Sequence, residues 1–265
     1  MKKTKISIVI PVYQPDSKVF EMQREMLKKQ TLKAEIVINE NLPQAISFNK
    51  GIKKAKGDII ITLAQDCVPE TRNWLKKLVY PLLKDKNVVA AVSDLILPEW
   101  YWKKYPFMTR MTTMKDIGKR RPNMDARACA FRKKDLIKAR MFNENPNVVA
   151  IDQYLYNNLK NIGKIVHPNV SVFHLHPLTN MKKLKLDYKY AKEIGRTLLN
   201  LKFDDSRLWI RIIRAVPILG ILAILPVFPF KKYGYYFPAY VLFSPIQHIM
   251  YLAGFWKGFL MGDKN

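Results

Sequence analysis

The stretch GDIIITLAQDCVP, residues 57–69, contains a run of six apolar or β-branched residues, 59–64, which leads directly into the polar pair Gln65 and Asp66. A continuous apolar run of this length is typical of a strand that is buried on both faces of a sheet. Aspartate is a common turn residue, so Asp66 can simply end the strand. Open α/β sheets also bind their ligands at the carboxyl ends of parallel strands, which makes Asp66 a candidate binding residue.

On both sides of this stretch, predicted strands alternate with predicted helices. The Ile- and Val-rich run ISIVIPVY, residues 6–13, predicts a central parallel strand. A helix is expected to start near Ser17, and another from Trp74, which Pro81 is expected to interrupt. Further segments are expected as strands at 35–39, 88–92, 128–131 and 164–176, and as helices at 45–55 and 151–162. This alternation predicts an α/β fold with a mostly parallel sheet flanked by helices.

Composition and charge narrow the class of protein. The chain has 265 residues, and 49% of them are hydrophobic, which excludes an intrinsically disordered chain. Its 46 Lys and Arg against 21 Asp and Glu give a net charge of +25, which indicates an anionic partner. Cys67 and Cys129 form neither a disulfide framework nor a zinc motif, so a reducing compartment is expected. We predict no secretory signal, because the first apolar run is short and ends in a proline.

The composition changes after about Asp205 to a mostly apolar segment that five prolines break. Neither of its apolar runs is an uninterrupted span of about 20 residues, the length that crosses a bilayer. Basic residues flank the runs, and Tyr and Trp residues suit the headgroup region. Residues 181–265 are therefore predicted as helices that lie in a membrane interface or form a shallow re-entrant hairpin, with a buried helical subdomain as the alternative.

Several motifs in one order resemble a family-two glycosyltransferase with the GT-A (Rossmann-like) fold. They are SIVIPVY, the strand ending at Glu40, FNKGIKKAKGDIIITLAQD, ACAFRKK, FNEN followed by Asp152, and VFHLH. The strongest of them matches the family's Asn-x-Gly-x-x-x-Ala-x-Gly-Asp pattern from Asn49 and continues to the acidic metal motif at Asp66. The resemblance covers residues 6 to about 176.

The resemblance implies a glycosyltransferase that moves a hexosyl or deoxyhexosyl group, with inversion, from a nucleotide-diphosphate sugar. The acceptor is expected to be a lipid-linked or cell-surface glycan, as in polysaccharide biosynthesis at the cell envelope. A catalytic domain is expected over residues 1–180, with the nucleotide-sugar side at about 1–93 and the acceptor side at about 94–180. Together with the basic C-terminal region, this predicts an enzyme at the cytoplasmic face of the cell membrane, bound to its anionic surface.

The resemblance also assigns a cofactor and a donor site. The family uses an Asp-x-Asp motif to hold a divalent cation, Mg²⁺ or Mn²⁺, and here the motif reads Ala64-Gln65-Asp66. Asp66 and His174 are the expected metal ligands. The residues expected to contact the nucleotide sugar are Pro11, Val12, Tyr13, Glu40, Asn49, Gln65 and Asp66. Tyr13 can equally cover the end of the sheet without touching a ligand.

Asp152 is the expected catalytic base, because the family uses the Asp of a Glu-Asp pair at the start of a helix. Ile151 replaces the Glu here. A carboxylate in a first helical turn is also explained by the helix dipole alone. Arg127, Arg132 and His176 are expected to contact an acceptor or a phosphate, although the two arginines can also be solvated surface residues.

Three other classes of protein compete with this interpretation. A catalytically degenerate module that only binds nucleotide sugar stays open, because Gln65 and Ile151 replace expected acids. A nucleic-acid-binding protein is suggested by the charge alone, and no motif of that class is present, so no nucleic-acid partner is expected. A dinucleotide-dependent oxidoreductase is disfavoured, because the first strand lacks the Gly-x-Gly-x-x-Gly sequence.

Overall fold

The chain divides into two compact units. The computed structural model describes residues 4–120, 124–145, 151–197, 208–224 and 228–262. The first unit comprises Met1–Pro98 and Gly118–His176, and the second comprises Glu99–Ile117 and Pro177–Asn265. Residues 99–117, which the sequence assigned to the acceptor side of the catalytic domain, therefore group with the C-terminal helices.

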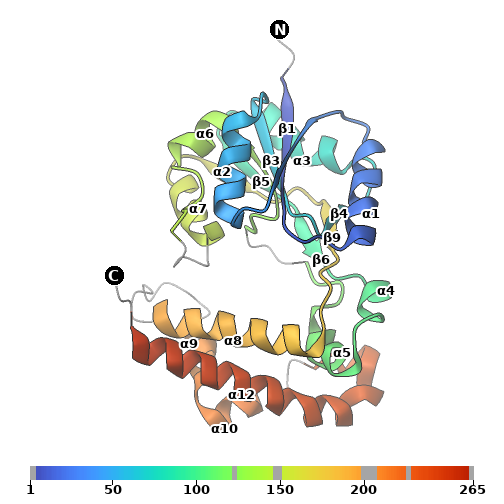
Figure 1. Ribbon diagram of the computed structural model, residues 1–265, viewed down its shortest axis with the longest axis vertical. Helices are drawn as coiled ribbons and strands as arrows, with labels where there is room; N and C mark the ends of the chain where they lie inside the picture. Colours follow the sequence, from blue (N-terminus) through green and yellow to red (C-terminus); the bar gives the residue numbers. More distant parts are fainter. Residues whose placement is uncertain (1–3, 121–123, 146–150, 198–207, 225–227, 263–265) are drawn as a thin grey trace. The chain divides into compact units, whose positions relative to one another are not determined.

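A six-stranded sheet forms the centre of the first unit (Figure 1), and its strands have the order β2-β1-β3-β7-β5-β8. Strand β1 pairs in parallel with β2 and β3, and β5 pairs in parallel with β8, whereas β7 is antiparallel to both its neighbours. The strands are β1 Ile6–Val12, β2 Glu35–Glu40, β3 Ile59–Leu63, β5 Val88–Val92, β7 Ala128–Arg132 and β8 Lys164–Val166. The predicted α/β fold with a mostly parallel sheet is confirmed.

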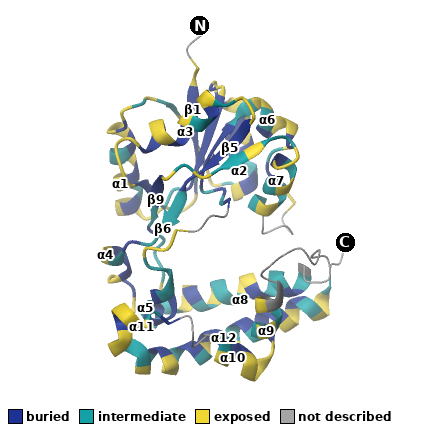
Figure 2. Cartoon of the chain, turned by 180° about the vertical axis from the view of Figure 1, so that it is seen from behind, coloured by how far each residue is buried: buried dark blue, intermediate teal, exposed yellow. Residues whose placement is uncertain are grey.

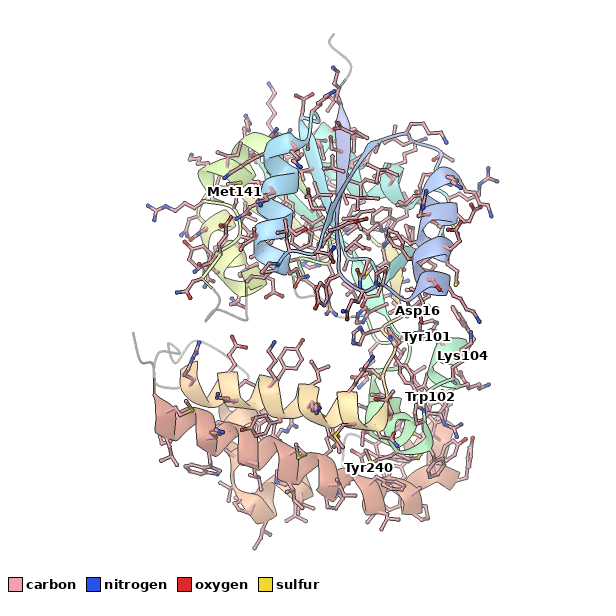
Figure 3. The ribbon with its side chains drawn as sticks, in the orientation of Figure 1. Asp16, Tyr101, Trp102, Lys104, Met141 and Tyr240 are labelled. Atoms are coloured by element: carbon pink, nitrogen blue, oxygen red, sulfur yellow. The ribbon has the colours of Figure 1, made fainter. Side chains whose placement is uncertain are left out.

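Side chains alternate along each strand, so both faces of this sheet carry apolar residues, and helices cover both faces (Figure 1). The central strands are therefore almost entirely buried (Figure 2). In β1, Ile8 and Ile10 join the core under α1 and α3, while Val9 joins the core under α2, α6 and α7. The helices are α1 Ser17–Lys28, α2 Gln44–Lys54, α3 Trp74–Lys84, α6 Lys133–Lys138 and α7 Ile151–Leu159. Asp16, which Figure 3 labels, caps α1 by accepting a hydrogen bond of 3.1 Å from the Val19 N–H.

A second, three-stranded sheet has the order β4-β9-β6. Its strands are β4 Cys67–Pro69, β6 Asp94–Ile96 and β9 Ser171–His174. The antiparallel register of β4 and β9 places Cys67 opposite His174. The region 164–176, predicted as one strand region, thus supplies two strands, β8 and β9, to two different sheets. Because Asp66 directly precedes Cys67, this register also brings His174 close to Asp66.

The prediction that Pro81 interrupts its helix was wrong, because α3 continues through Pro81 to Lys84. Its C-terminal end is stabilised from the neighbouring strand. Arg132 donates from Nε to the Val88 carbonyl at 3.1 Å and from Nη2 to the Asp85 carbonyl at 2.8 Å. Arg132 Nη2 also donates to the carbonyl of Leu82 in the last turn of α3, where carbonyl groups have no later N–H of the helix as a partner.

The second unit is helical, and its main elements pack along one another. They are α4 Glu99–Trp102, α5 Phe107–Thr113, α8 Asn180–Thr197, α9 Leu208–Ala215, α10 Pro217–Ile224, α11 Phe230–Tyr233 and α12 Phe237–Met261, with 3-10 turns at Met114–Asp116 and Gly234–Tyr236. Asp187 of α8 pairs with Lys183 and accepts a 2.9 Å hydrogen bond from Gln247 of α12. Within the part of the chain that the structure describes, none of the helices combines the length and the apolar character needed to cross a bilayer.

Candidate functional site

The carboxyl ends of three parallel strands lie side by side. The register pairs Val12 of β1 with Glu40 of β2, and Gln65 follows β3, which pairs with the other side of β1. The Gln65 amide binds the backbone of Tyr13 twice: Oε1 accepts from the N–H at 2.7 Å and Nε2 donates to the carbonyl at 2.9 Å. Gln65 therefore joins two strand ends, and its amide is not free to bind a metal. The Tyr13 side chain is 59% exposed and Glu40 is exposed, as a nucleotide contact would require.

Asp66 meets two histidines at the edge of this site. Its Oδ2 lies 3.3 Å from His174 Nε2 and 3.0 Å from His176 Nδ1. Alternation along the β9 segment points both imidazoles to the same side, and the Leu175 N–H between them donates to the Asp66 carbonyl at 2.8 Å. The structure thus brings together Asp66, His174 and also His176, which the sequence assigned to the acceptor.

The electrostatics of this cluster favour an ionised Asp66. Burial opposes ionisation, but His174 and His176 outweigh it and hold the pKa of Asp66 well below its usual range. Burial, together with the charge of Arg127, lowers the pKa of His174. A neutral imidazole beside a carboxylate is the protonation state in which both groups can bind a metal ion.

Asp125 and Arg127 form an ion pair next to His174. Arg127 donates from Nε to Asp125 Oδ1 at 2.7 Å, and its Nη2 pairs with Oδ2. Its Nη1 lies 3.0 Å from His174 Nε2. Burial raises the pKa of Asp125, but Arg127 outweighs it, so the pKa is lowered and the pair stays charged. Sequence reasoning missed Asp125; the only signal was a carboxylate two residues before a predicted arginine contact.

Asp152 belongs to the same group of charges. Burial raises its pKa, Asp125 raises it further, and Arg127 lowers it, so these three side chains lie within electrostatic range. The Gln153 N–H donates to Asp152 Oδ1 at 3.0 Å and orients the carboxylate at the start of α7. Asp66 in turn raises the pKa of Arg127, so the two acids predicted as metal ligand and base both interact electrostatically with this arginine.

Two predicted site residues serve other purposes. Asn49 is buried in α2, donates to the Phe142 carbonyl and to Glu144 Oε1 at 2.8 Å each, and accepts from the Phe142 N–H. It therefore holds the segment after α6 rather than a ligand. Arg132 lies opposite Ile59, at the other end of β3 from Asp66, where it binds the end of α3. The structure does not bring Arg132 to the site. Pro11 and Val12 form the end of β1, half-buried and buried respectively.

The residues present fit a divalent metal ion. Ligand atoms of Asp66, His174 and His176 lie within 4.8 Å of one another, close enough for one ion to reach all three. The set holds one carboxylate oxygen and two imidazole nitrogens. Mg²⁺ prefers oxygen ligands, so the nitrogen donors favour a transition-metal ion such as Mn²⁺.

Comparisons with known proteins agree with the fold and with a family assignment. The model of the family described as Glycosyl transferase family 2 matches residues 20–141, which include Asp66, Asp125 and Arg127. The fold is similar to that of the mannosyltransferase PcManGT from Pyrobaculum calidifontis, solved in complex with GDP-Man and Mn²⁺, with a TM-score of 0.63 and 14% sequence identity. That alignment covers 99% of this chain and 88% of the other. No curated protein matches the sequence.

Proposed function

Since this chain belongs to glycosyl transferase family 2 through residues 20–141, and is a glycosyltransferase, we propose that it transfers a sugar with inversion from a nucleotide-diphosphate donor. The observation that carries the proposal is the group of charges at one end of the sheet. The Asp66 cluster and Asp152 there share Arg127 and Asp125 as neighbours.

The donor half of the site is formed by the strand ends. Tyr13 offers an exposed ring for stacking on a nucleobase, and Glu40 offers carboxylate oxygens to its N–H groups. Gln65 fixes the backbone of Tyr13 through two hydrogen bonds and so positions the ring. Asp66, His174 and His176 would hold the divalent ion, which supplies positive charge for the departing diphosphate.

Asp152 acts as the general base. In the transfer, the acceptor oxygen forms a bond to the anomeric carbon, the bond from that carbon to the diphosphate oxygen breaks, and the acceptor proton passes to the Asp152 carboxylate. A base must be ionised to accept a proton, and a raised pKa makes its carboxylate a stronger base. Burial and the charge of Asp125 raise the pKa of Asp152 in this way.

The test is a panel of nucleotide sugars, with GDP-mannose included because the structural neighbour binds it. Product formation with Mn²⁺ or Mg²⁺ is measured for wild type and for Asp152→Asn. Loss of a general base lowers the rate about 10²–10⁴-fold, so we expect a loss of this size in kcat with nucleotide binding retained. Asp58→Asn is the matched control, because Asp58 is exposed at the opposite end of β3. A catalytically degenerate module would bind a nucleotide sugar and form no product in wild type.

We further propose that the enzyme lies on the cytoplasmic face of the cell membrane and uses a lipid-linked or surface-glycan acceptor. Helix α12 supports this, because it exposes a stripe of apolar residues in addition to the face that it buries. Its outward stripe is apolar, with Leu260 80% exposed, and recurs at helical spacing through Leu242, Ile246, Ile249, Ala253, Trp256 and Leu260. Its inward face carries the buried polar residues Ser244, Gln247 and His248 together with buried aromatic residues such as Phe255.

Charge supports the same partner. No Asp or Glu occurs between Ser206 and Gly262, whereas that segment has six Lys and Arg. Helix α10 adds further exposed apolar residues, of which Ile218 is 74% exposed. A large exposed apolar surface with basic residues around it is typical of a helix that lies in the interface of an anionic bilayer.

Vesicle flotation tests this surface. The intact protein is expected to float with vesicles that contain an anionic phospholipid and to float less with neutral ones. Each buried Leu or Ile side chain contributes about 1.5–3 kcal/mol, so Leu242→Glu with Ile249→Glu should lower binding by ~100-fold or more. Leu83→Glu, at an exposed leucine of α3 in the first unit, is the control. Equal flotation of the α12 variant and wild type would contradict the proposal.

A further inference from the structure

The Nε2 atom of His174 faces two groups with opposite requirements. Arg127 Nη1, which can only donate, lies 3.0 Å away, and Asp66 Oδ2, which as a carboxylate oxygen can only accept, lies 3.3 Å away. One imidazole nitrogen carries either a hydrogen or a lone pair, so it cannot satisfy both. The shorter contact, with Arg127, requires the lone pair. A metal ion bound between His174 and Asp66 would require the same lone pair.

Arg127 is held in this position by Asp125. The carboxylate accepts hydrogen bonds from the Arg127 side chain at Nε and Nη2 and from the Arg127 backbone N–H at 3.1 Å. This fork leaves Nη1 directed at His174. The guanidinium is therefore a fixed group of the site and not a solvated surface side chain, which was the alternative from the sequence.

The charges of the site disfavour the binding of a divalent metal ion when no nucleotide is present. Asp66 is the only carboxylate in the ligand set, and Arg127 touches a second ligand, His174. A divalent ion there would lie beside a guanidinium whose position Asp125 fixes, and like charges at this range repel strongly in a partly buried site. A nucleoside diphosphate removes the conflict, because its oxygens bind both the metal ion and a guanidinium.

We propose that Arg127 donates a hydrogen bond to the lone pair on His174 Nε2 that a metal ion would need. When a divalent ion binds together with a nucleoside diphosphate, the phosphate oxygens accept the hydrogen bonds of the guanidinium instead, and the lone pair becomes available to the ion. This inference rests on the proposed function, because it requires a metal-dependent nucleotide-sugar site. It makes metal and nucleotide binding mutually dependent. By linkage, each must raise the affinity of the other by the same factor, and Arg127 sets part of that factor.

The test measures metal binding and needs no turnover. Mn²⁺ is titrated into the metal-free intact protein, with and without GDP or UDP, and free Mn²⁺ is followed by electron paramagnetic resonance. Wild type is expected to bind Mn²⁺ at least about tenfold more tightly with the nucleotide present. Arg127→Gln is expected to bind Mn²⁺ alone about tenfold more tightly than wild type and to gain less from the nucleotide. Arg120→Gln, which removes an arginine paired with Asp94, is expected to behave as wild type.

Arg127→Gln leaves the Asp125 carboxylate without its partner, so the double variant Arg127→Gln with Asp125→Asn is measured in parallel, and circular dichroism checks both folds. If the folded variants bind Mn²⁺ alone no more tightly than wild type, while wild type still couples Mn²⁺ to nucleotide, the role of Arg127 is refuted and the proposed function stands. If wild type binds no Mn²⁺ even with nucleotide, the metal site itself fails, and the proposed function fails at that point.

Discussion

Replacing Gly258 with alanine tests how closely α8 and α12 pack. A Cβ atom at Gly258 would lie 2.7 Å from the carbonyl carbon of Lys192 and 3.0 Å from the Arg196 nitrogen, and closer still to the Lys192 carbonyl oxygen. All of these are backbone atoms of α8, which cannot rotate away as a side chain does. The helices must therefore separate, which also stretches the 2.9 Å hydrogen bond from Gln247 to Asp187.

The expected magnitude follows from three opposing effects. Overpacking costs about 1–3 kcal/mol, and a weakened hydrogen bond costs about 1 kcal/mol. Alanine favours the helix over glycine by about 1 kcal/mol. The free energy of unfolding should thus fall by ~1–3 kcal/mol in Gly258→Ala.

Urea unfolding followed by circular dichroism measures the change. Gly234→Ala is the matched control, because a Cβ there meets no atom within 4 Å and the backbone φ is −49°. It should leave stability unchanged or slightly raised. If Gly258→Ala unfolds at the same or a higher urea concentration than wild type, the close packing of α8 and α12 is refuted.

Three further outcomes are expected. The charge of Asp125 raises the pKa of Asp152, so Asp125→Asn should lower that pKa and move the acid limb of the pH profile of kcat/KM to lower pH. An acid limb that stays in place or moves to higher pH would contradict this. Gln65→Ala removes two hydrogen bonds to the Tyr13 backbone, worth about 1 kcal/mol each. Calorimetry should therefore show nucleotide binding weakened by ~10-fold or more, and unchanged binding would refute the role of Gln65 in positioning Tyr13. Arg132→Met should lower the free energy of unfolding by ~2 kcal/mol, yet leave nucleotide affinity as in wild type, since it binds α3 and not the site.

The sequence predicted the strands well because burial on both faces leaves a local signal. The runs at 6–13 and 59–64 consist mostly of apolar residues, and Tyr13 and Asp66 at their ends lie where a ligand site in such a sheet is expected. Pro81 was misjudged because a local rule was applied to a helix that tertiary contacts stabilise. Tertiary packing often overrides the propensity of a single residue.

The site depends on contacts between distant segments. His176 reaches Asp66 across 110 positions, and this requires the antiparallel register of β4 and β9. Arg127 and Arg132 are equally basic and five positions apart in the sequence. Since a strand rises about 3.4 Å per residue, they lie ~17 Å apart in the direction of β7. Only the pairing of β7 with β3 decides which of them contacts the cluster of Asp66 and the two histidines.

The C-terminal region shows the same division. Its composition was enough to predict apolar, basic helices, but composition does not tell which face of a helix is buried. Packing against α8 buries Gln247, packing against α10 buries His248, and the apolar stripe of α12 stays outside. The sequence by itself determined the fold class, the ends of the central strands and the acid at the end of β3, because these follow from apolar runs and their neighbours along the chain. Only the tertiary structure decided which charged side chains surround that acid, because register and packing join residues that no local pattern connects.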